Sequence, residues 1–159
     1  MPNWCANGLT LKHEDSAMID KAVAALAKGE LLETFIPIGE WDYNKALEAW
    51  GTKWDVGGEG VSIERIDENT VAMSFDSAWA PPTHAYVAFE SLGFDVDAYY
   101  YEPGMCFCGH YSDGYDDFYE YSDMNSEEVA ANIPSEIDEY FCISESMAQW
   151  EEENEEDEE

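Results

Sequence analysis

Residues 61–75, VSIERIDENTVAMSF, and residues 81–101, PPTHAYVAFESLGFDVDAYYY, decide the fold of this chain. In the first stretch apolar residues alternate with polar ones on both sides of Glu68-Asn69, which predicts a β-hairpin. In the second, a proline pair opens a helix that Gly93 ends, and another alternating run after it predicts a strand. Together they predict the order strand, strand, helix, strand.

The residues before this stretch predict one more strand and one more helix. Alternating apolar residues over 5–11 indicate a half-buried strand, and helical spacing over 19–26 indicates an amphipathic helix. Asp15 or Ser16 would cap that helix, and Gly29 would end it. The resulting βαββαβ order predicts an α+β fold: a ferredoxin-like antiparallel sheet with both helices on one face.

Further elements extend this plan on its C-terminal side. Residues 105–121 predict an added β-hairpin, and Asn125 with Glu128 predicts the capping box of a short helix. A last helix is expected from Ser135, with an inward face formed by Ile137, Tyr140, Phe141, Met147 and Trp150. Between the first helix and the central hairpin, only a helical turn around residues 43–50 is predicted. We expect one domain over residues 1–150 and a disordered acidic tail over residues 151–159.

The charge of the chain is large and unevenly distributed. Its 159 residues carry 37 acids and 6 bases, a formal net charge of -31. All six Lys and Arg residues precede Ile66, and the 26 acids from Ile66 onward have no Lys or Arg among them. Such a surface repels nucleic acid and anionic lipid, so direct binding to either is not expected. The 45% hydrophobic content excludes a fully disordered acidic protein.

Composition also bears on location. The N-terminus lacks the basic and apolar regions of a signal peptide, and no apolar run approaches the ~20 residues of a membrane span. Four irregularly spaced cysteines do not form a disulfide scaffold. A cytoplasmic location is therefore predicted, and the oligomeric state stays open.

One segment is a candidate metal or ligand site. Cys106, Cys108 and His110 would share a face if they lie on a strand, with Cys5 as a possible fourth ligand, and thiolates with imidazole suit zinc. However, C-x-C on an extended strand separates the two sulfurs by about 6–7 Å, too far for one tetrahedral zinc. Buried thiols are the favoured interpretation, and no cofactor is predicted.

Catalytic motifs are not found in the sequence. The three histidines, His13, His84 and His110, sit in no recognisable nucleophile motif. Carboxylates are so abundant that adjacent pairs carry no information without an apolar pocket to shift a pKa. We therefore predict a non-enzymatic protein.

A tyrosine-rich acidic strip over residues 95–121 is the strongest candidate site. Basic residues in this strip would favour single-stranded nucleic acid, whereas acidic ones favour a basic protein partner. The predicted partner-binding acids are Asp95, Asp97, Glu102, Asp113, Asp116, Asp117 and Glu120, with Tyr99 and Tyr101 as anchors. Lys53, Trp54, Trp79 and Pro82 are instead expected at a packed junction beside the second helix.

The acidity permits two interpretations. Eighteen carboxylates from residue 66 to the tail equal the phosphate charge of roughly 30 Å of duplex DNA. This match favours a DNA mimic, or another binder of a basic protein, whose association is fast and salt-sensitive. The alternative is an acidic accessory protein whose charge serves only solvation.

Several short motifs occur together and in order: Asn3-Trp4-Cys5, Gly51-Thr52-Lys53-Trp54-Asp55, Ala78-Trp79-Ala80-Pro81-Pro82, Glu102-Pro103-Gly104 and Phe107-Cys108-Gly109. With these motifs the chain resembles the YubB-like (Api-type) family of phages and plasmids over about residues 1–145. The resemblance implies a ferredoxin-like domain and a mobile-element origin, and it carries no catalytic residues. It favours counter-defence as the function, with a basic, nucleic-acid-binding host protein as the target.

Overall fold

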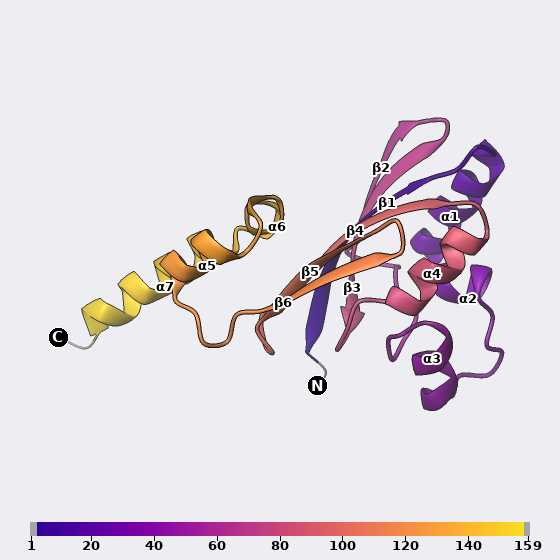
Figure 1. Ribbon diagram of the computed structural model, residues 1–159. Coiled ribbons are helices and arrows are strands. Elements are labelled where there is room, and N and C mark those ends of the chain that lie inside the picture. Colours follow the sequence, from indigo (N-terminus) through magenta and orange to yellow (C-terminus); the bar gives the residue numbers. More distant parts are fainter. Residues whose placement is uncertain (1–2, 158–159) are drawn as a thin grey trace.

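The computed structural model describes residues 3–157, and it places seven helices and six strands in that part of the chain (Figure 1). The strands are β1 (Trp4–Lys12), β2 (Ser62–Asp67), β3 (Thr70–Ala78), β4 (Asp95–Glu102), β5 (Phe107–Ser112) and β6 (Tyr115–Glu120). The helices are α1 (Ser16–Lys28), α2 (Leu31–Phe35), α3 (Tyr43–Ala49), α4 (Thr83–Ser91), α5 (Ser126–Asn132), α6 (Ser135–Phe141) and α7 (Ile143–Asp157).

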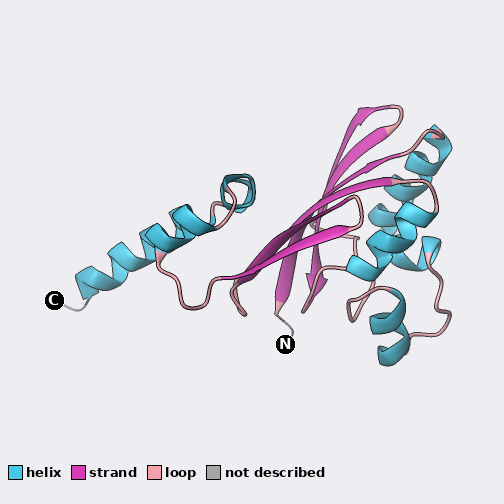
Figure 2. Ribbon diagram, viewed as in Figure 1, coloured by secondary structure: helices cyan, strands magenta, loops and turns pink. Residues whose placement is uncertain are grey.

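All six strands form one antiparallel sheet in the order β2-β3-β1-β4-β5-β6. The fold is therefore mixed α+β, as predicted. Its sheet has six strands, whereas the βαββαβ plan alone has four. The predicted hairpins are confirmed as β2–β3 and β5–β6. Since β1 pairs with both β3 and β4, the first strand of the chain lies in the middle of the sheet (Figure 2).

Helices α1 to α4 cover one face of the sheet and enclose the main core (Figure 1). Leu9 and Leu11 of β1 lie beside Val71, Met73 and the other inward residues of neighbouring strands, and all are buried against α1 and α4. The strict alternation of apolar residues that marked these strands in the sequence is the cause of this burial.

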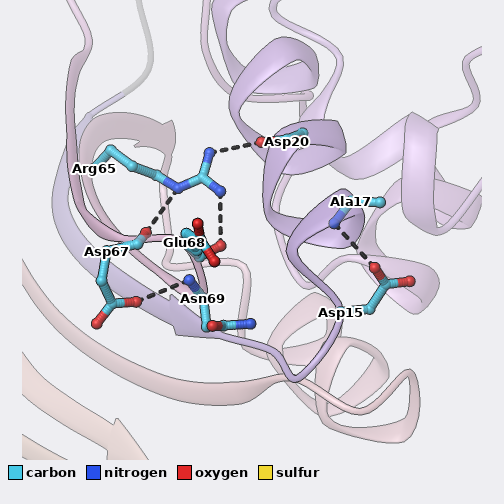
Figure 3. Close-up of polar contacts among 7 residues, drawn as sticks. All are labelled: Asp15, Ala17, Asp20, Arg65, Asp67, Glu68 and Asn69. Atoms are coloured by element: carbon cyan, nitrogen blue, oxygen red, sulfur yellow. Dashed lines mark hydrogen bonds and ion pairs between the residues drawn. The ribbon is translucent and has the colours of Figure 1, made fainter.

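The start of α1 is held against the β2–β3 hairpin by polar contacts (Figure 3). Asp15 caps α1 by accepting from the Ala17 N–H at 3.0 Å, as one of the two predicted caps. Arg65 donates to Asp20 of α1 at 2.7 Å and also to backbone carbonyls of the hairpin turn. This arginine therefore links helix and hairpin at the exposed surface.

Helix α2 was not predicted, and a residue far along the chain caps it. Its own N-cap residue, Glu30, makes no side-chain cap. Instead the Asp55 carboxylate accepts from Leu32 N–H at 2.7 Å and from Glu33 N–H at 2.9 Å. Because a five-residue helix gains little stability from its own hydrogen bonds, this tertiary cap accounts for α2.

The other face of the sheet is partly covered by α5 to α7, which enclose a second core. Its buried members are Cys108, Tyr121, Val129, Ile133, Ile137 and Ile143. Gly8 shows how closely α6 approaches β1, since a Cβ there would lie 1.9 Å from the Tyr140 hydroxyl. The two cores therefore lie on opposite sides of one sheet.

The C-terminal region differs from prediction in two ways. The single helix expected from Ser135 is broken at Cys142, which has a left-handed φ of 54°, and Tyr140 and Trp150 are exposed rather than inward. The acidic run expected to be disordered is helical to Asp157, and residues 158–159 lie outside the described part. Glu151 links the start of this run to α5 by accepting from Ser126.

Candidate partner-binding site

The predicted tyrosine anchors lie on the sheet face that α6 covers. Tyr99 is stacked between His110 and Tyr140, at centroid distances of 4.3 and 5.2 Å. Tyr101 packs against Phe141 at 5.3 Å within the second core. Both predicted anchors are therefore partly buried against the C-terminal helices.

Glu102, which was predicted to contact a partner, is not on the surface, because only 1% of it is exposed. Its carboxylate accepts from the N–H groups of Gly104 and Met105, both at 2.7 Å, and so holds the turn between β4 and β5. The alternation of β4 explains this burial, since Glu102 follows Val96, Ala98 and Tyr100 on the inward side.

Two further predicted acids already have partners in the chain. Asp97 contacts the Nε2 atom of His110. Asp116 accepts from the Tyr100 hydroxyl at 2.5 Å, and burial together with this hydrogen bond raises the pKa of Tyr100. Both carboxylates remain at least partly exposed. They therefore still contribute to the surface potential.

The remaining predicted acids are exposed and lie mostly on one hairpin. Asp113 is at the tip of the β5–β6 hairpin, and Asp117 and Glu120 are on the edge strand β6. Along β6 successive side chains point to opposite faces, so Asp116 and Asp117 make both faces of this edge acidic. Asp95 stands apart, opposite the basic Lys12 of β1.

The strand order converts the uneven sequence charge into an uneven surface. Strands β4 to β6 are adjacent in the sheet. Helix α6 packs on β4 and β5, and α5 and α7 join it around the second core. We call this region, residues 95–157, the acidic half. It contains 20 acids and no Lys or Arg, whereas every Lys and Arg belongs to segments up to and including β2.

Exposed aromatic residues of the acidic half differ from those predicted. Tyr115 on β6 is 77% exposed and Phe118 is half exposed. Trp150 on α7 is 65% exposed. Tyr115 and Phe118 are exposed because β6 lies at the edge of the sheet. In the sequence, only the order of the hairpins indicated that β6 would be an edge strand.

The cysteines and His110 do not form a ligand set. Cys5 and Cys108 lie on opposite faces of the sheet, as the register of β1, β4 and β5 requires, so Cys5 cannot complete a site with Cys108. His110 contacts Asp97, and Cys106 lies in the turn before β5 with a φ of 57°. Among residues 3–157, no three His, Cys, Asp or Glu side chains group as metal ligands.

Thiol reactivity tests this placement of the cysteines. Burial raises the pKa of Cys5 and of Cys108 to about 12, so both thiols stay protonated at neutral pH. A thiol reagent should therefore label Cys106 and Cys142 rapidly in the native protein, and all four cysteines in denaturant. Mass spectrometry of the labelled peptides shows which cysteines have reacted. Rapid labelling of Cys5 or Cys108 in the native protein would contradict their buried placement.

The expected junction beside the second helix has mixed exposure. The Lys53 ammonium lies 4.5 Å above the Trp54 ring, which is 6.0 Å from Trp4. Pro82 is buried, but Trp79 is 48% exposed and has a positive φ of 72°. Trp79 therefore extends beyond the packed part of this junction.

Comparisons with known proteins place the chain only distantly. No family model matches it, and no curated protein does. The crystal structure of a protein api92 from Yersinia pseudotuberculosis, with the family model DUF1281, is similar at 22% identity and a TM-score of 0.38. The match covers 50% of this chain and 30% of that chain. Membership of the Api-type family and a phage or plasmid origin both stay predictions.

Within residues 3–157, no helix has the length and hydrophobicity that a membrane-spanning segment requires.

Proposed function

We propose that this chain is a non-enzymatic acidic protein of a mobile element that binds a basic host protein through its acidic half. The observation that supports this most is the segregation of charge: residues 95–157 form one side of the sheet with 20 acids and no Lys or Arg. Negative charge concentrated in one region attracts a positive partner at long range and accelerates association. A nucleic-acid-binding or defence protein, inhibited by DNA mimicry, is the proposed target class.

We also propose that residues 4–102 form a ferredoxin-like unit, as in the Api-type family that the motifs resemble. The βαββαβ order, with sheet neighbours β2-β3-β1-β4 and both α1 and α4 on one face, supports this assignment. In this proposal the β5–β6 hairpin and α5 to α7 are additions that carry most of the acidic surface. The unit itself implies no activity.

Matched charge variants test the role of the acidic half. We expect Asp113→Asn, Asp117→Asn and Glu120→Gln together to weaken capture of one basic nucleic-acid-binding protein from bacterial lysate. The control changes three exposed acids of the other half, Glu40→Gln, Glu48→Gln and Glu59→Gln, and produces the same net charge. Because the overall charge is equal, only the position of the lost carboxylates differs.

The bound protein is then purified and the complex is measured directly. Binding should be strong at ~0.1 M salt, weak at ~1 M salt, and competed by duplex DNA, since screening shortens the reach of the charges. Equal loss of binding in both triple variants, or recovery of only unrelated basic proteins, would overturn the proposal. It would then favour the accessory protein whose acidity serves solvation.

A further inference from the structure

We propose that a groove between α7 and the turn joining β4 to β5 binds a basic, amphipathic helix of the partner protein. The groove has a volume of about 670 Å³ and is formed by three segments: the β4–β5 turn, the connection from β6 to α5, and α7. This inference rests on the proposed function and specifies where, and by what kind of segment, a basic partner is held.

The groove is lined mainly by apolar side chains. Tyr101 and Pro103 form the wall on the sheet side, and Met124 contributes from the connection to α5. On α7, Met147 and Trp150 are three residues apart and therefore share one side of the helix. Trp150, at 65% exposed, supplies a large apolar surface that nothing in residues 3–157 covers.

Two methionines make this surface adaptable. Methionine is unbranched and polarizable, so it repacks against apolar partners of irregular shape. Met124 and Met147 are both only partly buried at the edge of the second core. The groove therefore suits the apolar face of a helix more than a ligand with one fixed outline.

The charge around the groove selects a basic occupant. Glu151, at its rim, accepts from the Ser126 hydroxyl at 2.5 Å and from the Ser126 N–H at 3.0 Å. These hydrogen bonds lower the pKa of Glu151, so the rim keeps a negative charge at neutral pH. The chain has a net charge of -31, and even residues 1–65, which hold all six Lys and Arg, are net negative, so a second copy would bring like charge to this rim.

The lining also favours a helix over an extended segment. An extended segment must find partners for its backbone N–H and C=O groups, usually at the edge of a sheet. The groove is lined by α7, a turn and a connection rather than by a free strand edge. A helix satisfies its own backbone and needs only apolar contacts and charge complementarity.

Two peptides of equal composition test the proposal with the full chain. One, of about 18 residues of Leu and Lys, has Leu at helical spacing; the other has the same residues shuffled so that no apolar face forms. At ~0.15 M salt we expect the patterned peptide to bind at least ~10-fold more tightly by fluorescence anisotropy. Trp150→Ala should lower that affinity by ~10-fold and leave the shuffled peptide unaffected.

Tyr115→Ala is the matched control, because Tyr115 is an exposed aromatic of the acidic half outside the groove. It should leave the affinity of both peptides unchanged. Equal affinities for the two peptides, or equal effects of both substitutions, would overturn the groove while leaving charge-driven binding in place. If neither peptide bound at ~0.1 M salt, the proposed function would be overturned as well.

Discussion

Replacing Ile137 by aspartate should detach α5 to α7 from the sheet. The opposite face, which α1 to α4 cover, should stay folded. Ile137 is 2% exposed within the second core. Loss of a buried isoleucine costs about 2–5 kcal/mol, and an unpaired charge in its place costs more. Because the main core lies on the opposite face, we expect hydrogen exchange to accelerate in residues 121–157 while β1 and β3 stay protected.

Ile66→Asp is the control for this experiment. It is the same substitution on β2, where the isoleucine side chain is 58% exposed, so its effect on stability should be within about 0.5 kcal/mol. If Ile137→Asp lowered the protection of both faces together, the two cores would be one cooperative unit. If it behaved like Ile66→Asp, the second core would contribute no stability.

Asp55→Ala should destabilise the protein by about 1–3 kcal/mol, because partly buried N–H groups of α2 lose their acceptor. A third bond, from the Val56 N–H at 2.8 Å, is lost with them. Urea unfolding followed by circular dichroism measures the change in the free energy of unfolding. In this variant we also expect α2 to unfold at a lower temperature than the sheet.

The comparison for Asp55 is Asp20→Ala. Asp20 pairs with Arg65 at 2.7 Å on the exposed side of α1, and such surface pairs contribute about 0–1 kcal/mol. A loss at Asp55 no larger than the loss at Asp20 would mean that water replaces the carboxylate at the start of α2.

Local sequence patterns predicted most elements because each pattern reflects burial by a neighbouring layer. Alternation identified the strands, and Asp15 and Gly29 marked the ends of α1. The capping box at Asn125 and Glu128 was also present as predicted. Helix α2 was missed because its cap, Asp55, lies 22 and 23 residues from the N–H groups it accepts.

The sequence predicted that the candidate site is rich in acids and tyrosines, but not which of these side chains are exposed. Tyr99 and Tyr101 were predicted to be anchors for a partner, because alternation separates the two faces of a strand without saying what covers the second. Packing of α6 and of Phe141 decided that question. Glu102 was predicted to contact a partner because of its charge, although the alternation of β4 places it on the inward side, where N–H groups of the turn donate to its carboxylate.

The sequence by itself determined the strand and helix order, the excess of 31 negative charges and the absence of Lys and Arg after Arg65. Only the tertiary structure decided that these acids gather on one side, because that depends on β4, β5 and β6 being neighbours in the sheet. It also decided the groove beside Trp150, whose walls come from segments about 50 residues apart in the chain. Long-range pairing, rather than local preference, sets both features.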